Sequence, residues 1–447
     1  MEREPLGVVG AGWVGLVTAA SFAELGHRVT VRDVAADRVA MLTAGDVPIH
    51  EPGLAAVLER NRDRLRFTLE LGDTVESARI VFVCVGTPST PSGDADLSAV
   101  WEVVDELPPR DEPLVLVMKS TVPVGTGERV RARLDARGFA HVGYVSNPEF
   151  LAEGTALANF SEPDRVVVGS FVAADGDRVA ALHEPLGAPI VRTDVASAEM
   201  IKLASNAALA TRISLINEIA NVCELVGADV EEVARGIGLD RRLGPHFLRA
   251  GIGYGGSCFP KDASALKQLA ANSGYHFQLL AAVIEVNELQ KRRVVQKLVA
   301  HLGSLRKRTI ALLGLAFKPH TNDLREAPSL VLAPRLLNEG ALVRAWDPVA
   351  LEEARPFLPG VELVETLLQA VEGADAAVIV TDWPELEGLA TPAVREAMRT
   401  PLIVDGRNML DPAAVRQAGF AYEGIGRPAA VAPEGAPARA PRARVPG

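Results

Sequence analysis

The chain has 447 residues, of which 48% are hydrophobic, and a formal net charge of −11 at pH 7. This length predicts two or three domains, and the negative charge argues against nucleic acid or an anionic membrane as the main partner. Three cysteines in so long a chain argue against a disulfide framework and favour a reducing compartment. The first residues lack a secretory signal pattern and no apolar run reaches membrane-spanning length, so we expect a cytoplasmic protein without membrane insertion.

The first forty residues have the pattern of a nucleotide-binding turn. A strand is expected over residues 6–9, followed by Gly10-Ala11-Gly12-Trp13-Val14-Gly15, a helix over 16–25 and a second strand over 26–33. A lone G-x-G-x-x-G is weak evidence, but the preceding strand, the following helix and an acid that closes the next strand make it strong. The segment therefore predicts a dinucleotide-binding domain.

Each residue of this turn has an expected task. Gly10 permits the tight turn, Gly12 lets a pyrophosphate approach the backbone, and Gly15 lets helix and strand pack closely. The helix N-terminus would face the phosphates. Asp33 would accept hydrogen bonds from a ribose diol, so NAD is favoured over NADP, although the neighbouring Arg32 could meet a 2′-phosphate.

Three further strands are expected over 80–85, 114–118 and 141–145, separated by helical or loop material. This alternation predicts a parallel, doubly wound sheet, in which ligands bind at the carboxyl ends of the strands. Polar, proline-braced segments follow all three strands. Each could be an ordinary turn, but together they favour a site; they are residues 86–88, 119–123 and 146–149.

From residue 197 the pattern is helical. Lys202 and Asn206 are four residues apart and share a helix face. Asp229 and Glu232 have the spacing of a capping box that opens another helix. Residues 278–299 predict one long helix that links two domains and can pair with a second copy of itself.

The strand pattern then returns. Residues 309–314 predict a strand that enters a glycine turn, 340–347 mirror 26–33, and 376–381 mirror 80–86. This weak internal repeat predicts a second nucleotide-binding sheet. Its turn lacks the full glycine pattern and offers Lys318 and Arg325, so we expect it to hold phosphates by charge.

The predicted fold is α/β, with two Rossmann-like doubly wound parallel-sheet domains joined by a central helical domain that contains a long connecting helix. The expected boundaries are 1–196, 197–300 and 301–426. Residues 427–447 are rich in proline and alanine with scattered arginines, and this composition predicts a disordered tail.

A thiol lies in the glycine-rich segment Gly255-Gly256-Ser257-Cys258-Phe259-Pro260-Lys261-Asp262. Most free cysteines are small buried hydrophobes, and Cys84 and Cys223 fit that description because they lie in apolar patterns. Cys258 lies in a predicted loop, where access and the nearby Lys261 would lower its pKa. The segment predicts a covalent nucleophile.

The chain resembles the UDP-glucose/GDP-mannose dehydrogenase family from about residue 6 to residue 426. Many motifs match in order, which makes the resemblance highly specific; Trp13 stands where tyrosine is common. The remaining matches are Glu51-Pro52-Gly53-Leu54, Val85-Gly86-Thr87-Pro88, Lys119-Ser120-Thr121-Val122-Pro123-Val124-Gly125, Asn147-Pro148-Glu149-Phe150-Leu151-Ala152-Glu153-Gly154, Pro163-Asp164-Arg165, Ile201-Lys202-Leu203-Ala204-Ser205-Asn206, residues 255–262 and Gly314-Leu315-Ala316-Phe317-Lys318-Pro319.

The resemblance implies oxidation of a sugar C6 alcohol to a carboxylate with two NAD and a thioester on the way. By position, Cys258 is the nucleophile and Glu149 activates water for thioester hydrolysis. Lys202 and Asn206 stabilise the oxyanion, and Asp262 and Thr121 hold a water or accept a proton. No metal ion is expected.

The resemblance also implies contacts with both ligands. The sugar nucleotide would be bound by Glu149, Phe150, Leu151, Ala152, Glu153, Lys202, Asn206, Arg249, Tyr254, Gly255, Lys318 and Arg407, with Arg242 reaching across a dimer interface. The cofactor would be bound by Gly10, Gly12, Trp13, Val14, Gly15, Asp33, Arg38, Thr87, Ser120, Thr121, Glu153 and Arg325.

The motifs are closer to the UDP-glucose enzymes than to those for N-acetylmannosamine, so UDP-glucose is the expected substrate and GDP-mannose the alternative. A two-electron 3-hydroxy-acid dehydrogenase would share one sheet and the lysine and asparagine, but it would need neither Cys258 nor a second sheet. A catalytically silent sensor is disfavoured by the intact set of polar residues. The apolar surface of the helical middle predicts a homodimer or a higher homo-oligomer.

Overall fold

Eight strands form the N-terminal sheet in the order β3-β2-β1-β4-β5-β6-β7-β8 in the computed structural model, which describes residues 3–428. Neighbouring strands are parallel except β6 and β7, which pair antiparallel. The predicted doubly wound sheet is therefore confirmed, and β7 and β8 extend it. The strands are β1 Leu6–Val9, β2 Val29–Arg32, β3 Leu65–Thr68, β4 Ile80–Val83, β5 Leu114–Met118, β6 Val142–Ser146, β7 Val166–Ser170 and β8 Ile190–Thr193.

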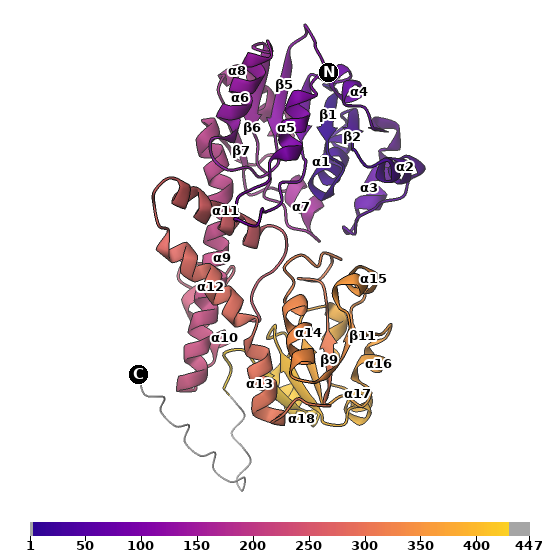
Figure 1. Cartoon of the computed structure of the whole chain (residues 1–447), viewed down its shortest axis with the longest axis vertical. Coiled ribbons are helices and arrows are strands. Elements are labelled where there is room, and N and C mark those ends of the chain that lie inside the picture. The colour runs from indigo at the N-terminus through magenta and orange to yellow at the C-terminus, as the bar shows by residue number, and fades with distance from the viewer. Residues whose placement is uncertain (1–2, 429–447) are drawn as a thin grey trace.

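Helices cover both faces of this sheet over apolar cores (Figure 1). The turn between β1 and α1 depends on glycine: Gly10 has a φ of 101°, and a Cβ at Gly15 would lie 1.8 Å from the Gly10 carbonyl oxygen. No other residue fits this approach of helix to strand. The helices are α1 Trp13–Glu24, α2 Ala36–Ala44, α3 Leu54–Arg60, α4 Leu71–Glu76, α5 Ser98–Asp105, α6 Thr126–Ala136, α7 Ala156–Ser161 and α8 Ala173–His183.

The C-terminal sheet has six parallel strands in the order β11-β10-β9-β12-β13-β14. Its second strand ends next to Asp347, whose Oδ2 accepts a hydrogen bond from the Leu315 N–H at 2.7 Å, as Asp33 Oδ2 accepts one from the Ala11 N–H at 2.7 Å. The internal repeat therefore includes the turn after the first strand of each sheet, β1 and β9. The strands are β9 Thr309–Leu313, β10 Leu342–Trp346, β11 Glu362–Leu363, β12 Ala376–Ile379, β13 Leu402–Asp405 and β14 Ala421–Gly424, with helices α14 Pro328–Asn338, α15 Leu351–Ala354, α16 Leu367–Val371, α17 Pro392–Ala397 and α18 Pro412–Gln417.

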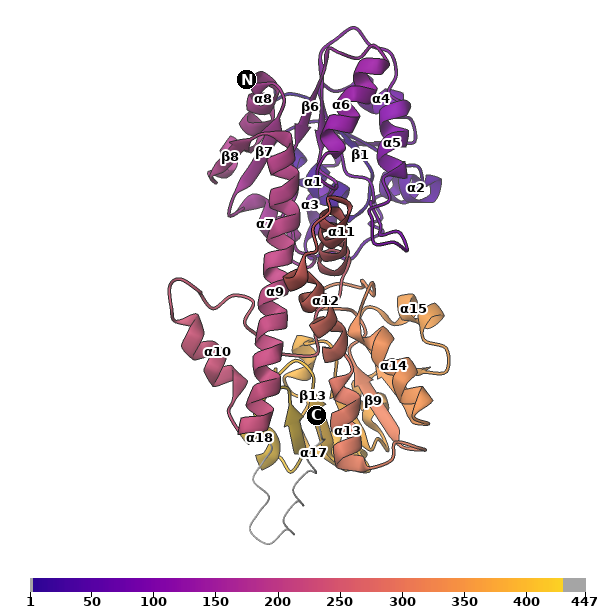
Figure 2. The ribbon, with the colours of Figure 1, turned by 60° about the vertical axis from the view of Figure 1, so that its left-hand side comes forward.

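A 32-residue helix, α9 (Val195–Val226), runs from the N-terminal sheet to the C-terminal sheet (Figures 1 and 2). The Asp194 side chain caps it by accepting from the Ser197 N–H, and Gly227 ends it with a φ of 81°. Four more helices lie in the middle of the chain: α10 Val230–Gly238, α11 Phe259–Asn272, α12 Gln278–Gln290 and α13 Arg293–Leu302. Helices α11 and α12 pack against α9.

Two sequence predictions in this region are wrong. The single helix over 278–299 is two helices, because the chain turns at Lys291 and Arg292 so that α13 packs on the C-terminal sheet. Lys291 is buried at this turn and its ammonium bonds the Glu288 carboxylate at 2.7 Å. The capping box is only half formed, because Asp229 caps α10 while the Glu232 side chain bonds Arg235 instead of the cap backbone.

Among residues 3–428, no helix has both the length and the apolar content that crossing a bilayer requires. Most of the predicted tail, 429–447, lies outside the described residues. Its first residue, Arg427, is fixed, because its guanidinium donates to the Leu410 carbonyl at 3.0 Å.

Candidate active site

A buried ion pair joins the N-terminal sheet to α9. Lys202 Nζ lies 2.9 Å from Glu149 Oε1, and their side chains are only 3% and 5% exposed. Glu149 follows β6, and its Oε2 also accepts the Leu151 N–H at 2.5 Å. Two cations lie over the Phe150 ring, with the Arg165 guanidinium 3.5 Å and the Lys202 ammonium 5.5 Å from its centre. Two of the predicted catalytic residues, Glu149 and Lys202, are thus in direct contact.

The pair keeps both groups charged. Burial alone raises the pKa of Glu149, but Lys202, the Leu151 N–H and Lys119 outweigh it, so the pKa lies below its usual value. Burial lowers the pKa of Lys202, and the negative charges of Glu149 and Asp262 outweigh that effect and raise it. The site therefore holds a buried carboxylate and a buried ammonium at neutral pH.

Cys258 lies at the start of α11, where it occupies the N-cap position, and its thiol is 3.6 Å from Ser257 Oγ. The prediction of a lowered thiol pKa is wrong. Burial raises the pKa of Cys258, Glu149 and Asp262 raise it further, and Lys202 only partly compensates. The Lys261 ammonium does not help, because it lies 2.6 Å from Asp262 Oδ1.

Asn206 and Asp262 complete the cluster around the thiol. Asn206 Nδ2 donates to Asp262 Oδ2 at 2.5 Å, and both side chains are buried. Asn206 lies one turn after Lys202 on α9, so this bond connects α9 to the first turn of α11. Five of the predicted catalytic residues therefore come from three places: Glu149 from the loop after β6, Lys202 and Asn206 from α9, and Cys258 and Asp262 from the start of α11.

Thr121 lies beyond the end of β5 and is held through its backbone. The Thr87 hydroxyl donates to the Thr121 carbonyl at 2.8 Å, and the Ser120 hydroxyl donates to the Val85 carbonyl at 2.7 Å. These bonds tie the segment after β4 to the segment after β5. They also occupy the Thr87 and Ser120 hydroxyl protons, so both residues shape this edge of the sheet.

The glycine turn offers space for a dinucleotide. A Cβ on Gly12 would meet nothing within 4 Å, and Gly12 caps α1 without a side chain on the amides of its first turn, Trp13 and Val14 among them. Asp33 closes β2, and its carboxylate is 3.2 Å from the Arg38 guanidinium. An open turn, exposed helix amides and a carboxylate at the second strand fit the phosphates and a ribose of NAD.

Trp13 and Glu153 share a cavity of about 370 Å³ between the N-terminal and C-terminal sheets. Glu153 Oε2 accepts from the Thr321 hydroxyl at 3.1 Å, and the Arg325 guanidinium lies 3.3 Å from Glu153 Oε1. Burial, together with Asp323, raises the pKa of Glu153 to about 7. The predicted cofactor residues Trp13, Glu153 and Arg325 therefore lie together.

A second cavity of about 230 Å³ lies between α9 and the C-terminal sheet, and it gathers predicted substrate residues: Arg249, Tyr254, Gly255, Lys318 and Arg407. Arg407 donates to the carbonyl oxygens of Gly253 and Phe317, both at 3.0 Å. Arg242 is not brought here: it is 88% exposed beyond α10 and pairs with Asp240. Lys318 and Arg325, which were both expected to hold phosphates at the turn of the second sheet, line different cavities.

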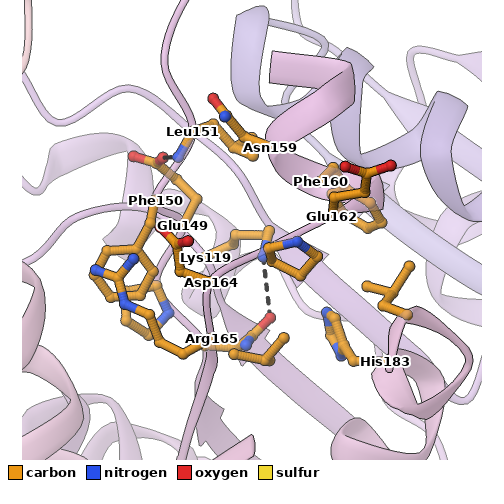
Figure 3. Close-up of a pocket in the computed structure, with 15 residues that line it drawn as sticks. Lys119, Glu149, Phe150, Leu151, Asn159, Phe160, Glu162, Asp164, Arg165 and His183 are labelled. Carbon is orange, nitrogen blue, oxygen red and sulfur yellow. Dashed lines mark hydrogen bonds between the residues drawn. The ribbon is translucent and has the colours of Figure 1, made fainter. Parts of the chain in front are cut away.

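Three buried residues near the site, Glu51, Lys119 and Asn147, belong to the family motifs, but the sequence predicts no role for them. Glu51 accepts the Trp13 indole N–H at 2.9 Å and the N–H groups of Gly154 and Ala156. Lys119 and Asn147 lie in a cavity of about 130 Å³ beside Glu149 (Figure 3). Nothing in the spacing of these residues reveals that they are buried, which is the property that marks them in the structure.

Comparisons with known proteins agree with this arrangement. Three family models match in order: the NAD binding domain at residues 5–187, the central domain at 196–289 and the UDP binding domain at 311–412. The chain belongs to the UDP-glucose/GDP-mannose dehydrogenase family. It is an NAD-dependent nucleotide-sugar dehydrogenase. The predicted family, fold class and cofactor are therefore confirmed.

Individual members of the family match along nearly their whole length. The UDP-glucose 6-dehydrogenase TuaD of Bacillus subtilis is 46% identical over 433 residues, 95% of this chain and 93% of its own. A UDP-glucose 6-dehydrogenase of Pseudomonas aeruginosa is 46% identical over 442 residues, 95% of this chain and 97% of its own. The structure of a UDP-glucose dehydrogenase from Pyrobaculum islandicum superposes with a TM-score of 0.88 at 38% identity, covering 95% of this chain and 98% of that one.

Proposed function

We propose that the enzyme oxidises UDP-glucose to UDP-glucuronate in two NAD-dependent steps, through a thiohemiacetal and a thioester on Cys258. The observation that carries the proposal is the position of the Cys258 thiol at the start of α11, beside the buried cluster of Glu149, Lys202, Asn206 and Asp262. When bound at the glycine turn, NAD accepts one hydride in each step. The residues of this chain bind the sugar, move protons and hold the acyl group.

In the first step the C6 alcohol loses a proton as it loses a hydride. A water held by Asp262 and Thr121 takes this proton, and the ammonium of Lys202 and the amide of Asn206 face the oxygen on which negative charge develops. The raised pKa of Lys202 supports this role, because the ammonium stays charged in a buried site.

In the second step the Cys258 sulfur adds to the aldehyde carbon, and the thiol proton leaves to solvent. Loss of the second hydride converts the thiohemiacetal to a thioester. Burial raises the pKa of Cys258 and keeps the resting thiol protonated. The thiolate therefore forms only when the substrate is bound and Lys202 contacts the sugar oxygen. Glu149, ionised at rest, then takes a proton from water, whose oxygen attacks the thioester carbonyl and releases the carboxylate product and the thiol.

The substrate assignment is supported by the second cavity and by the relatives. The cavity is lined by three cations, Arg249, Lys318 and Arg407, and by one carboxylate, Asp382, which pairs with Arg249. This excess of positive charge, with the rings of Tyr254 and Phe317, suits a uridine diphosphate. The curated relatives at 46% identity are named UDP-glucose 6-dehydrogenases. GDP-mannose is the alternative sugar nucleotide.

The enzyme is proposed to act as a homodimer built on α9. Apolar side chains that protrude from α9 and α12 support this proposal: Leu215, Val222, Leu225 and Leu279 are 53%, 57%, 82% and 61% exposed. The exposed Arg242 would then reach the sugar-nucleotide site of the partner, which explains why it lies outside the cavity of its own chain.

The test is the number of NADH formed per UDP-glucose consumed, with GDP-mannose and UDP-N-acetylmannosamine as comparators. Two NADH per UDP-glucose and slow turnover of the comparators support the proposal. One NADH with release of free aldehyde contradicts the thioester route, and a preference for GDP-mannose contradicts the substrate.

A further inference from the structure

Lys119 is a buried lysine whose ammonium has a neutral hydrogen-bond partner. It directly follows β5, its side chain is buried, and Nζ donates to Asn147 Oδ1 at 3.1 Å, the dashed line in Figure 3. Asn147 Nδ2 donates to the Val167 carbonyl at 2.8 Å, which fixes the amide so that its oxygen faces the lysine. Within residues 3–428, Lys119 has no carboxylate at ion-pair distance.

An ammonium in this position is costly. Removing a charge from water costs several kcal/mol unless a counter-charge compensates, and a methionine would fill the same volume without that cost. Burial, with the charge of Lys202, accordingly lowers the pKa of Lys119, and Cys84 and Glu149 work against that effect. Packing alone does not require a lysine here, so the charge itself needs an explanation.

The groups around Lys119 leave one candidate for its effect. His183 lines the same cavity, and burial lowers its pKa to about 3, so it is neutral. Burial raises the pKa of the nearby Cys84 to about 12, so that thiol is neutral as well. The carboxylates Glu162 and Asp164 also line the cavity, but Glu149 is the one that contacts Lys202 and whose pKa the Lys119 charge lowers (Figure 3).

Glu149 is faced by charges from several elements. Lys202 on α9 contacts it, Arg165 before β7 acts on it from the Phe150 side, and Lys119 acts from beyond β5. Cys258 and Asp262, at the start of α11, lie on the same side as Lys202, and both interact with the Lys202 charge. Of these cations, Lys202 is the one that the proposed reaction draws toward the substrate oxygen. Lys119 is fixed by Asn147 and stays in place.

We propose that Lys119 is a positioning residue that keeps the Glu149 carboxylate ionised for thioester hydrolysis while Lys202 interacts with the sugar oxygen. The inference rests on the proposed function, because it concerns the base of the hydrolytic step. A cation that shares a cavity with a buried carboxylate favours its charged form. Without Lys119, Glu149 would take up a proton at higher pH and lose its ability to accept one from water.

The test compares Lys119→Met with Lys297→Met. Lys297 is also a buried lysine, but it bridges Glu224 and Glu423 far from the thiol and serves as the matched control for loss of a buried charge. The measurements are kcat and KM against pH, and single-turnover hydrolysis of the Cys258 adduct followed by mass spectrometry. Circular dichroism verifies the fold, and Lys119→Gln replaces the methionine variant if that variant does not fold.

For Lys119→Met we expect the acidic limb of kcat to move up by about one pH unit, a loss of about tenfold on that limb. The adduct should accumulate at low pH, and the KM for UDP-glucose should change less than about twofold. Lys119→Arg, which keeps the charge, should restore the limb, and Lys297→Met should leave it in place.

An acidic limb that Lys119→Met leaves in place, in an enzyme that still forms two NADH per UDP-glucose, overturns the role of Lys119 and leaves the proposed function standing. An equal loss of kcat at every pH in Lys119→Met assigns the lysine to packing and also overturns the inference. A wild-type enzyme that yields one NADH per sugar contradicts the proposed function itself.

Discussion

Glu199 Oε1 accepts a hydrogen bond from the Gly127 backbone N–H at 2.8 Å, across a sequence separation of 72 residues. Its Oε2 accepts the Gly125 N–H at 2.7 Å. The carboxylate thereby caps α6 from α9, one turn before Lys202. This cap fixes the segment that carries Thr121 relative to the helix that carries Lys202, so two parts of the candidate active site are held in register.

The Glu199 cap predicts how stability depends on pH. Burial raises the pKa of Glu199 to about 7, although the two N–H groups lower it. Because the folded protein holds this proton more tightly than the unfolded chain, the Glu199 contribution is largest at low pH and is lost as the pH rises from about 4.5 to about 7. We expect that loss to be on the order of 1–3 kcal/mol. Glu199→Gln should remove this slope in urea unfolding measured across the range, and an unchanged slope would place the titration elsewhere.

Cys258→Ser should stop steady-state turnover while UDP-glucose and NAD still bind, because an alkoxide leaves an acyl group far less readily than a thiolate. Both hydride transfers can still occur once and leave an ester on the serine. Calorimetric binding and stopped-flow NADH absorbance separate the two effects. Cys84→Ser is the control, since the Cys84 thiol is buried with a pKa of about 12. Loss of turnover in Cys84→Ser with normal rates in Cys258→Ser would show that Cys258 is not the nucleophile.

Glu149→Gln should slow thioester hydrolysis more than hydride transfer, because an amide cannot accept a proton from water. It also removes the charge that Lys202 contacts at 2.9 Å, so a smaller loss in the first hydride step is expected as well. Mass spectrometry during turnover should show an adduct on Cys258. Absence of the adduct, together with a slowed first hydride step, moves Glu149 to another role.

NADP should be a much poorer cofactor than NAD, because the Asp33 carboxylate at the end of β2 repels a 2′-phosphate. Asp33 also accepts the N–H groups of Ala11 and Ala35, at 2.7 and 2.9 Å. Asp33→Ser should therefore raise the KM for NAD about tenfold or more and cost about 1–2 kcal/mol of stability. Comparison of kcat/KM for the two cofactors is the measurement. Equal use of NAD and NADP by the wild type contradicts the assignment of Asp33.

Arg242→Ala should raise the KM for UDP-glucose without dissociating the proposed dimer, since Arg242 is exposed in its own chain and is proposed to serve the partner. Arg235→Ala is a matched control, because Arg235 is an exposed arginine of α10 paired with Glu232. Sedimentation velocity and steady-state kinetics on both variants separate assembly from substrate binding. A fully active wild-type monomer contradicts both the shared site and the dimer.

The sequence was sufficient for much of the fold because local patterns reported it directly. Both sheets have a turn after the first strand and an acid at the end of the second strand. In each sheet the acid accepts a hydrogen bond from the turn, Asp33 from Ala11 and Asp347 from Leu315. The break between α12 and α13 was missed because residues 278–299 contain no glycine or proline that would signal the end of a helix. The turn at Lys291 arises from packing against the C-terminal sheet, a contact that periodicity does not encode.

The candidate site shows the same division. The types of the reacting residues could be read from the motifs, and the structure brings Glu149, Lys202, Asn206, Cys258 and Asp262 together. Their electrostatics could not be read in this way. The raised pKa of Cys258 follows from burial and from Glu149, which is more than a hundred residues away in the chain, whereas the neighbouring Lys261 is neutralised by Asp262.

The hydrogen bonds of Arg407 have a consequence for enzyme engineering. Arg407 follows β13 in the C-terminal domain, yet its guanidinium donates to the carbonyl of Gly253, five residues before the nucleophile. The domain that would select the nucleotide therefore also fixes the segment that presents the thiol. A chimera that exchanges the C-terminal domain to change nucleotide preference must keep this arginine and its acceptors, or the new specificity will come with a displaced sulfur.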